Sequence, residues 1–221
     1  MANPKVIALV GDSLSLPLKK SLRFSGLLID HRDMEVSFAN TYPAQLQMGI
    51  SGIKALITTH AERGATTSNL SPRLTNIIRN FQPDAFVLNI GTSDCRFRPK
   101  TLRRVGGELW QKVSLSEFRT NLSECVMPLK MSGALVVTLS ILPASSEVLR
   151  KYPGSDEIFN AYNEVLAAFT RAIDGTFVNL AARIVDVDQF VTSDGFHYNT
   201  RMHSLVAATL NQVIWNALAP E

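Results

Sequence analysis

Two short segments near opposite ends of the chain contain the residue types that a nucleophilic serine site needs. Ser13 lies in a Gly-Asp-Ser turn near the N-terminus, and Asp194 and His197 stand three residues apart near the C-terminus. A serine hydroxyl is a poor nucleophile unless a base takes its proton and a third group holds that base in the right tautomer. The spacing lets the Asp194 carboxylate bond one ring nitrogen of His197 while the other nitrogen faces Ser13.

Each of these residues also has a simpler interpretation. Ser13 would cap the segment that follows it, and Asp194 with His197 would cap the last helix. Cys95 paired with His197 is a third alternative, because a cysteine beside a histidine is a common nucleophile.

Four segments resemble, in order and spacing, the sequence blocks of the SGNH, or GDSL, hydrolases. The stretch VIALVGDSLS at residues 6–15 is similar to the block that contains the family's nucleophile, and DGFH at residues 194–197 to the block that contains its acid and base. GATT at residues 64–67 resembles the block whose glycine donates to the oxyanion. GTSD at residues 91–94 resembles the remaining block.

The resemblance implies a role for each matching residue and a reaction. Ser13 would be the nucleophile, His197 the base and Asp194 the acid that orients it, while the backbone N–H groups of Ser13 and Gly64 would hold the oxyanion. The substrate would be an ester, with an O-acetyl or other short acyl group on a carbohydrate or small molecule. Water as the acceptor would make the chain an esterase, and a sugar hydroxyl would make it an O-acyltransferase; the sequence leaves both open.

One position departs from the family pattern. Asp94 is preceded by Ser93, where the family normally has an asparagine that donates to the oxyanion. Loss of one such donor can lower the rate by about 100- to 1,000-fold. Ser93 is therefore either a shorter oxyanion donor or a bystander, and a catalytically weak fold that binds a glycan or a partner protein is a further alternative. GTSDCRFRP and the opening GDSLSLP also resemble a subgroup associated with bacterial surface-polysaccharide gene clusters, where this asparagine is often absent.

A basic segment, residues 96–112, follows Asp94 directly. It holds several arginines and lysines, beginning with Arg96 and Arg98, against the single acid Glu108. One interpretation is a substrate-binding flap in which Arg96 and Arg98 contact an anionic or sugar-containing ligand. The alternative is a solvated insertion whose charges face water.

Continuous apolar runs that stop at turn residues predict the strands that must position these residues. Three such runs are residues 5–10, 84–90 and 134–139. Residues 34–39 alternate in polarity and predict an edge strand, and residues 176–180 predict the last strand.

Apolar residues at helical spacing predict four helices between and after these strands. The first has Ser71 as its N-cap and an apolar face that ends at Phe81. The second begins with a capping box at residues 114–117. The third and fourth follow apolar stripes over residues 158–173 and 205–214.

Strands that alternate with helices predict a parallel sheet covered on both faces, with its chemistry beyond the carboxyl ends of the strands. The family resemblance implies the same class, α/β, as a three-layer α/β/α sandwich with a flavodoxin-like, doubly wound sheet of about five parallel strands. All three candidate catalytic residues would then meet at one edge of that sheet.

The composition sets the remaining expectations. The chain has 221 residues, of which 46% are hydrophobic and 19% charged, and no linker divides it, so one domain over residues 1–221 is expected. A formal net charge of +3 does not indicate nucleic-acid binding, and no apolar stretch reaches membrane-spanning length.

Two cysteines and no secretory leader favour the cytoplasm. The remaining histidines lack metal-ligand spacing and no glycine-rich phosphate loop is present, so neither a metal nor a cofactor is expected. The oligomeric state is left open.

Overall fold

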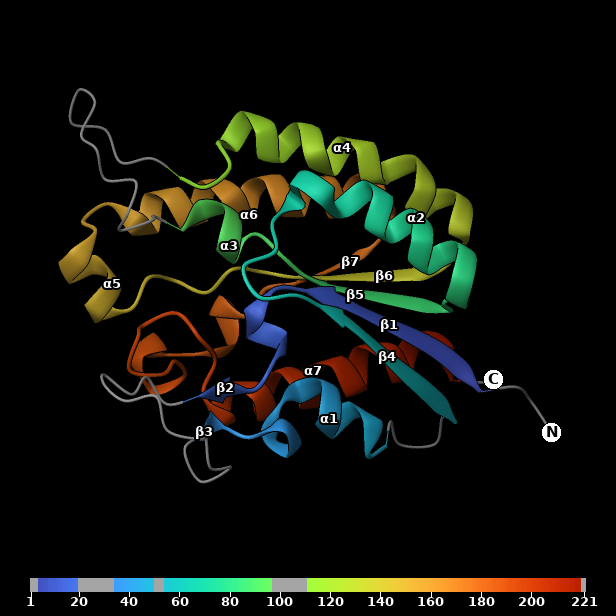
Figure 1. Ribbon diagram of the computed structural model, residues 1–221, viewed down its shortest axis with the longest axis horizontal. Coiled ribbons are helices and arrows are strands. Elements are labelled where there is room, and N and C mark those ends of the chain that lie inside the picture. The colour runs from blue at the N-terminus through green and yellow to red at the C-terminus, as the bar shows by residue number, and fades with distance from the viewer. Residues whose placement is uncertain (1–3, 20–33, 50–53, 97–110, 220–221) are drawn as a thin grey trace, which may run out of the picture.

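A five-stranded parallel sheet forms the centre of the protein (Figure 1). The computed structural model describes residues 4–19, 34–49, 54–96 and 111–219. The strand order is β4-β1-β5-β6-β7, and the strands are β1 (Lys5–Gly11), β4 (Ala55–Ala61), β5 (Ala85–Asn89), β6 (Leu135–Leu139) and β7 (Thr176–Val178). This order reproduces the predicted α/β class and its doubly wound topology.

Helices cover both faces of the sheet (Figure 1). On one face lie α2 (Leu70–Phe81), α4 (Leu115–Ser132) and α6 (Ser155–Ala172), and on the other lie α1 (Tyr42–Gln47) and α7 (Thr200–Leu218). Two short helices, α3 (Thr92–Cys95) and α5 (Ser146–Lys151), lie near the carboxyl ends of the strands.

The central strands are apolar throughout because both of their faces are covered. All five residues of β5 are buried. Along β1, Ala8 and Val10 belong to the apolar cluster under α2, α4 and α6, whereas Ile7 and Leu9 belong to the cluster under α1 and α7. The alternation of side chains along one strand therefore contributes to both cores.

The helix predictions hold with two corrections. The capping box of α4 is confirmed, since the Ser114 side chain accepts from the Glu117 N–H and the Glu117 carboxylate accepts from the Ser114 N–H. The helix predicted to have Ser71 as its N-cap begins two residues earlier, with Asn69 at the N-cap. Phe81 is 42% exposed and places its ring against that of His60, so it does not extend the buried face as predicted.

The predicted edge strand over residues 34–39 is wrong. Only Met34–Val36 (β3) is extended, and it pairs antiparallel with Leu18–Lys19 (β2) in a separate two-stranded sheet. The edge beside β1 is instead β4, which the sequence analysis did not predict. Its polar residues Thr58, Thr59 and His60 interrupt the apolar pattern because one side of an edge strand faces water.

Candidate active site

The candidate site lies at the carboxyl edge of the sheet, where the strand order reverses. From β1 the chain passes to β4 on one side and then to β5 on the other, so the switch point lies between β1 and β5. In doubly wound sheets this crevice is where ligands bind. Ser13 opens a single 3-10 turn, Ser13–Ser15, directly after β1, and the Asp12 N–H donates to the Asn89 carbonyl at the end of β5.

The structure brings Ser13, His197 and Asp194 together although the first two are 184 residues apart. The Ser13 Oγ lies 2.8 Å from the His197 Nε2. The His197 Nδ1 lies 2.5 Å from the Asp194 Oδ2. With the proton of the neutral ring on Nδ1, this nitrogen donates to the carboxylate and Nε2 accepts from the hydroxyl.

The loop that holds the acid and the base is a closed turn. A bridge between Val191 and Tyr198 closes its base, and the Thr192 N–H donates to the His197 carbonyl. Gly195 has a φ of +78°, and a Cβ there would lie 2.4 Å from the Ser145 Oγ. This position therefore requires glycine.

The Asp194 carboxylate is held in its ionised form. Its Oδ1 accepts from the Thr192 hydroxyl and from the N–H groups of Phe196 and His197. Burial would raise the pKa of Asp194, but the hydrogen bonds and charge of the His197 ring, with the backbone donors, outweigh it and hold the pKa well below its usual value. A permanently ionised carboxylate can orient the ring and stabilise it when protonated.

Asp12 joins the nucleophile turn to the segment that contains Ser93. Its carboxylate is 2% exposed and accepts from the Leu14 N–H at 2.9 Å and from the Ser93 N–H at 3.1 Å. Burial raises the pKa of Asp12, although these hydrogen bonds oppose the rise. The Ser93 side chain also interacts with Asp12 and lowers its pKa. Asp12 therefore engages both the backbone and the side chain of Ser93.

Gly64 lies in the loop that follows β4. Its φ is +69°, which favours glycine, and its carbonyl accepts a hydrogen bond from the Lys112 ammonium group. Lys112 is the last residue of the predicted basic segment, so this segment ends against the predicted oxyanion loop.

Asp94 organises the same loop. Its Oδ1 accepts from the Thr67 N–H at 2.9 Å and from the Thr67 hydroxyl at 2.6 Å, and Asn121 donates in turn to the Thr67 hydroxyl. The Oδ2 is buried and has no hydrogen-bond partner among the described residues. Burial is the main cause that raises the pKa of Asp94 to about 6.

The structure does not favour Cys95 as a nucleophile. The thiol is fully buried and donates to the Thr92 carbonyl, and burial raises its pKa well above the usual value. Reactive cysteines have the opposite shift.

Of the two arginines predicted to bind substrate, the structure describes only Arg96. The Arg96 guanidinium lies 4.0 Å from the centre of the Phe196 ring, next to His197, in cation–π geometry. Arg98 lies outside the described residues, as do residues 97–110 of the predicted flap.

A buried polar cluster lies below the nucleophile turn, and sequence reasoning missed it. The Ser15 Oγ lies 2.6 Å from the Tyr42 hydroxyl, and the Tyr42 N–H donates to the His203 Nδ1. Burial, with a smaller effect of His197, lowers the pKa of His203 to about 4, so this ring is neutral. Because these contacts engage Ser15 and His203 with Tyr42, they stabilise the turn and do not form a second nucleophile pair.

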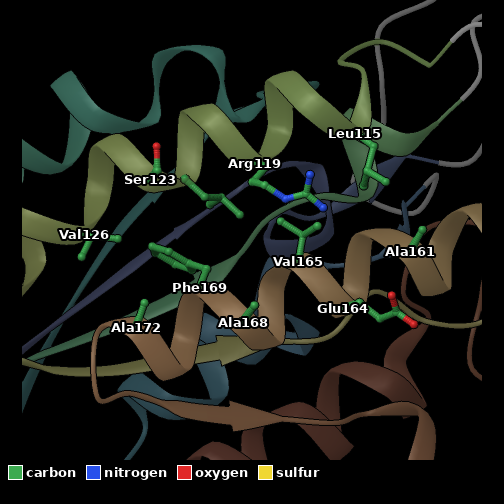
Figure 2. Close-up of a pocket in the computed structure, with 11 residues that line it drawn as sticks. Leu115, Arg119, Ser123, Val126, Ala161, Glu164, Val165, Ala168, Phe169 and Ala172 are labelled. Atoms are coloured by element: carbon green, nitrogen blue, oxygen red, sulfur yellow. The ribbon is translucent and has the colours of Figure 1, made fainter.

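Two cavities differ in their relation to the site. A small one, about 10 Å³, is lined by residues beside the nucleophile and the base, including Leu14, Thr92 and Phe196. A larger groove lies between α4 and α6 (Figure 2) and includes none of the candidate site residues. Within the described ranges, no cluster of three or more potential metal ligands occurs, and no helix is long and apolar enough to cross a membrane.

Comparison with known proteins gives a consistent picture. Residues 10–205 match the GDSL-like Lipase/Acylhydrolase family. No curated protein matches the chain. One similar solved structure is a lipase/acylhydrolase from Enterococcus faecalis, with 19% identity over 98% of each chain and a TM-score of 0.72. Another is a catalytic mutant of Axe2, an acetylxylan esterase from Geobacillus stearothermophilus, with 15% identity over 97% of this chain and 95% of that chain and a TM-score of 0.68. The esterase EstA from Pseudoalteromonas sp. has 15% identity over 98% of this chain and 100% of its own, with a TM-score of 0.65.

Proposed function

As a member of the GDSL-like lipase/acylhydrolase family, this chain is a serine ester hydrolase, and we propose that Ser13, His197 and Asp194 are its catalytic residues. The observation that supports this assignment is the continuous hydrogen-bonded path from the Ser13 hydroxyl through the His197 ring to the Asp194 carboxylate. The match to the family covers both ends of this path, since it extends from residue 10 to residue 205.

The reaction has two halves. The Ser13 Oγ attacks the ester carbonyl, His197 takes the hydroxyl proton at Nε2 and then gives it to the leaving alcohol, and the acyl group stays on Ser13. Water then attacks the acyl-enzyme, again losing a proton to His197, which returns it to the Ser13 Oγ as the free acid leaves. Asp194 remains ionised and stabilises the imidazolium in both halves.

The proposed oxyanion donors are the N–H groups of Ser13 and Gly64, with Ser93 as a third member. Among the described residues, neither of these two N–H groups donates to a protein acceptor, so both are available to a developing negative charge. Ser93 can contribute only if its hydroxyl turns away from Asp12.

The proposed substrate carries an acetyl or other short acyl group on a carbohydrate or small molecule. The small cavity beside Leu14, Thr92 and Phe196 has room for little more than one water-sized group. The acetylxylan esterase among the similar structures acts on such an ester. Arg96 remains our proposed contact for an anionic or hydroxyl-rich alcohol group, because its guanidinium lies beside the loop of the base.

Hydrolysis of p-nitrophenyl acetate tests the catalytic assignment. We expect Ser13→Ala and His197→Ala each to lower kcat/KM by about 1,000-fold or more, and Asp194→Asn by about 100-fold or more. Ser116→Ala, an exposed serine of α4, is the matched control and should retain wild-type activity. Equal turnover by wild type and Ser13→Ala would refute the assignment. Transfer of the acetyl group to an added sugar at the expense of hydrolysis would instead identify an O-acyltransferase with the same residues.

A further inference from the structure

The groove between α4 and α6 is an apolar cavity of about 300 Å³ (Figure 2). Its floor consists of buried side chains of both helices, namely Leu122, Val165 and Phe169. Cavities of this volume are at the lower end of the range that holds small-molecule ligands. All of its lining residues lie on α4 and α6, whereas Ser13 follows β1 at the carboxyl edge of the sheet.

Small side chains keep this groove open. Along α6, Ala161, Ala168 and Ala172 line it together with Val165, at spacings of three to four residues that place them on one face of the helix. Their methyl groups are too short to fill the space beside α4. Hydrocarbon surface that a longer side chain would cover is therefore accessible from outside.

One cation faces this apolar surface. Figure 2 shows the Arg119 side chain extending from α4 over the groove, with its guanidinium between Leu115 and Val165. Arg119 forms no ion pair or hydrogen bond with any other described residue. Ser123 is already engaged, since its hydroxyl donates to the Thr120 carbonyl.

The other charge at the groove is Glu164, which lies at its margin. Figure 2 places Glu164 at the same end as Ala161, away from the apolar end at Val126 and Ala172. Glu164 also borders a separate polar cavity with Asn160 and Asn163. The groove lining therefore holds one guanidinium and, at its margin, one carboxylate beside a long apolar surface.

We propose that this groove binds an aliphatic carboxylate of medium chain length. The carboxylate would pair with the Arg119 guanidinium, whose planar donors match its two oxygens, and the hydrocarbon chain would lie over Leu122 and Phe169 toward Val126 and Ala172. Burial of the hydrocarbon chain on this surface supplies the apolar contribution to binding. A neutral alcohol of the same length would keep the apolar contribution and lose the charged contact.

Titration with decanoate tests this proposal by calorimetry. We expect saturable binding to the wild type, and about tenfold weaker binding to Arg119→Gln. Decanol should bind both proteins alike, because it lacks the carboxylate. Arg171→Gln, which removes an exposed arginine of α6 that does not line the groove, is the charge-matched control and should bind decanoate as the wild type does.

Variants that fill the groove test the proposal independently of Arg119. Ala168 is exposed on α6, so Ala168→Phe places a ring in the groove without entering the core, and Ala172→Leu provides a smaller replacement if the first variant folds poorly. Either should lower decanoate affinity at least about tenfold while hydrolysis of p-nitrophenyl acetate stays at the wild-type rate. Unchanged affinity in these variants would place the ligand elsewhere, for example at Ser13, and would overturn the proposal. Absence of saturable binding at millimolar decanoate would overturn it as well.

Discussion

Ser93 is the residue that would limit the proposed site. A serine hydroxyl has a single proton, and the Ser93 side chain interacts with the buried Asp12 carboxylate and lowers its pKa. A proton that faces Asp12 cannot also stabilise an oxyanion. An asparagine amide has two N–H donors, so one can serve Asp12 while the other faces the substrate.

The substitution Ser93→Asn should therefore raise kcat for p-nitrophenyl acetate, by about 10- to 100-fold, because it adds a free donor to the oxyanion site. Ser93→Ala should lower kcat by less than about tenfold, since the hydroxyl it removes is engaged by Asp12. Steady-state kinetics of wild type, Ser93→Asn and Ser93→Ala would test both expectations. A loss of more than about 100-fold in Ser93→Ala would show instead that the hydroxyl is an essential oxyanion donor.

The free energy of unfolding should depend on whether the Asp94 carboxyl is protonated. Burial raises its pKa from 3.8 to about 6, so the folded carboxyl holds its proton more tightly than the unfolded one. Its contribution to the free energy of unfolding is thus fully present below about pH 4 and is lost as the pH rises toward about 6. At about 1.4 kcal/mol for each pKa unit, the loss amounts to roughly 3 kcal/mol.

The variant Asp94→Asn should remove this dependence, because an amide keeps an oxygen for the two Thr67 donors and has no proton to lose. Urea unfolding between pH 4 and pH 7 would measure it. The difference in stability between variant and wild type should shift in favour of the variant as the pH rises. A difference that stays constant over this range would contradict the raised pKa.

At the level of elements, sequence patterns succeeded where local chemistry determines the structure. The capping box at Ser114 and Glu117 needs only residues within one turn, and the apolar runs of β1 and β5 follow from burial on both faces. Strand β4 was missed because an edge strand with Thr58 and Thr59 has no such run. The edge strand predicted over residues 34–39 was wrong because pairing is decided by other segments of the chain, here Leu18 and Lys19.

The candidate site likewise combines residues that short motifs predict with contacts that the sequence alone does not predict. Ser13, Asp194 and His197 could be proposed from short motifs, and the structure brings them within hydrogen-bond distance. The contacts of Lys112 with Gly64, and of Asn121 with Thr67, join segments that are far apart in sequence. Since no local pattern encodes such contacts, only the folded chain shows them.

Two glycine substitutions, one within the loop of residues 191–198 and one outside it, should differ in their effects. Gly133 and Gly195 both have positive φ, but a Cβ at Gly133 meets nothing within 4 Å, whereas one at Gly195 meets the buried Ser145 hydroxyl. Gly133→Ala should cost about 1 kcal/mol and leave activity intact. Gly195→Ala should cost more than about 2 kcal/mol and lower kcat, because the clash displaces Asp194 and His197. Thermal melts and p-nitrophenyl acetate kinetics would test both, and normal activity in Gly195→Ala would contradict the argument.

Over the whole molecule, the site is built on the strands that the fold protects best. Strands β1 and β5 each pair on both sides, and each lies between two apolar clusters. Strands β4 and β7 pair on one side only, and β7 has three residues. Ser13 therefore follows a central strand, while the loops that bring Gly64 and His197 to it are attached to less protected elements or to the surface.

This arrangement predicts an order of hydrogen exchange across the sheet. Hydrogen-bonded amides of β1 and β5 can exchange only when both apolar clusters open, so their exchange should report global unfolding. Hydrogen-bonded amides of β4 and β7 need only the loss of one neighbour, and should exchange at least about tenfold faster by local opening. Amide exchange followed by NMR, in wild type and in Ser13→Ala, would measure both groups under the same conditions. Equal rates in β7 and β5 would mean that the sheet opens as one unit, and the nucleophile would then have no more support than the edges do.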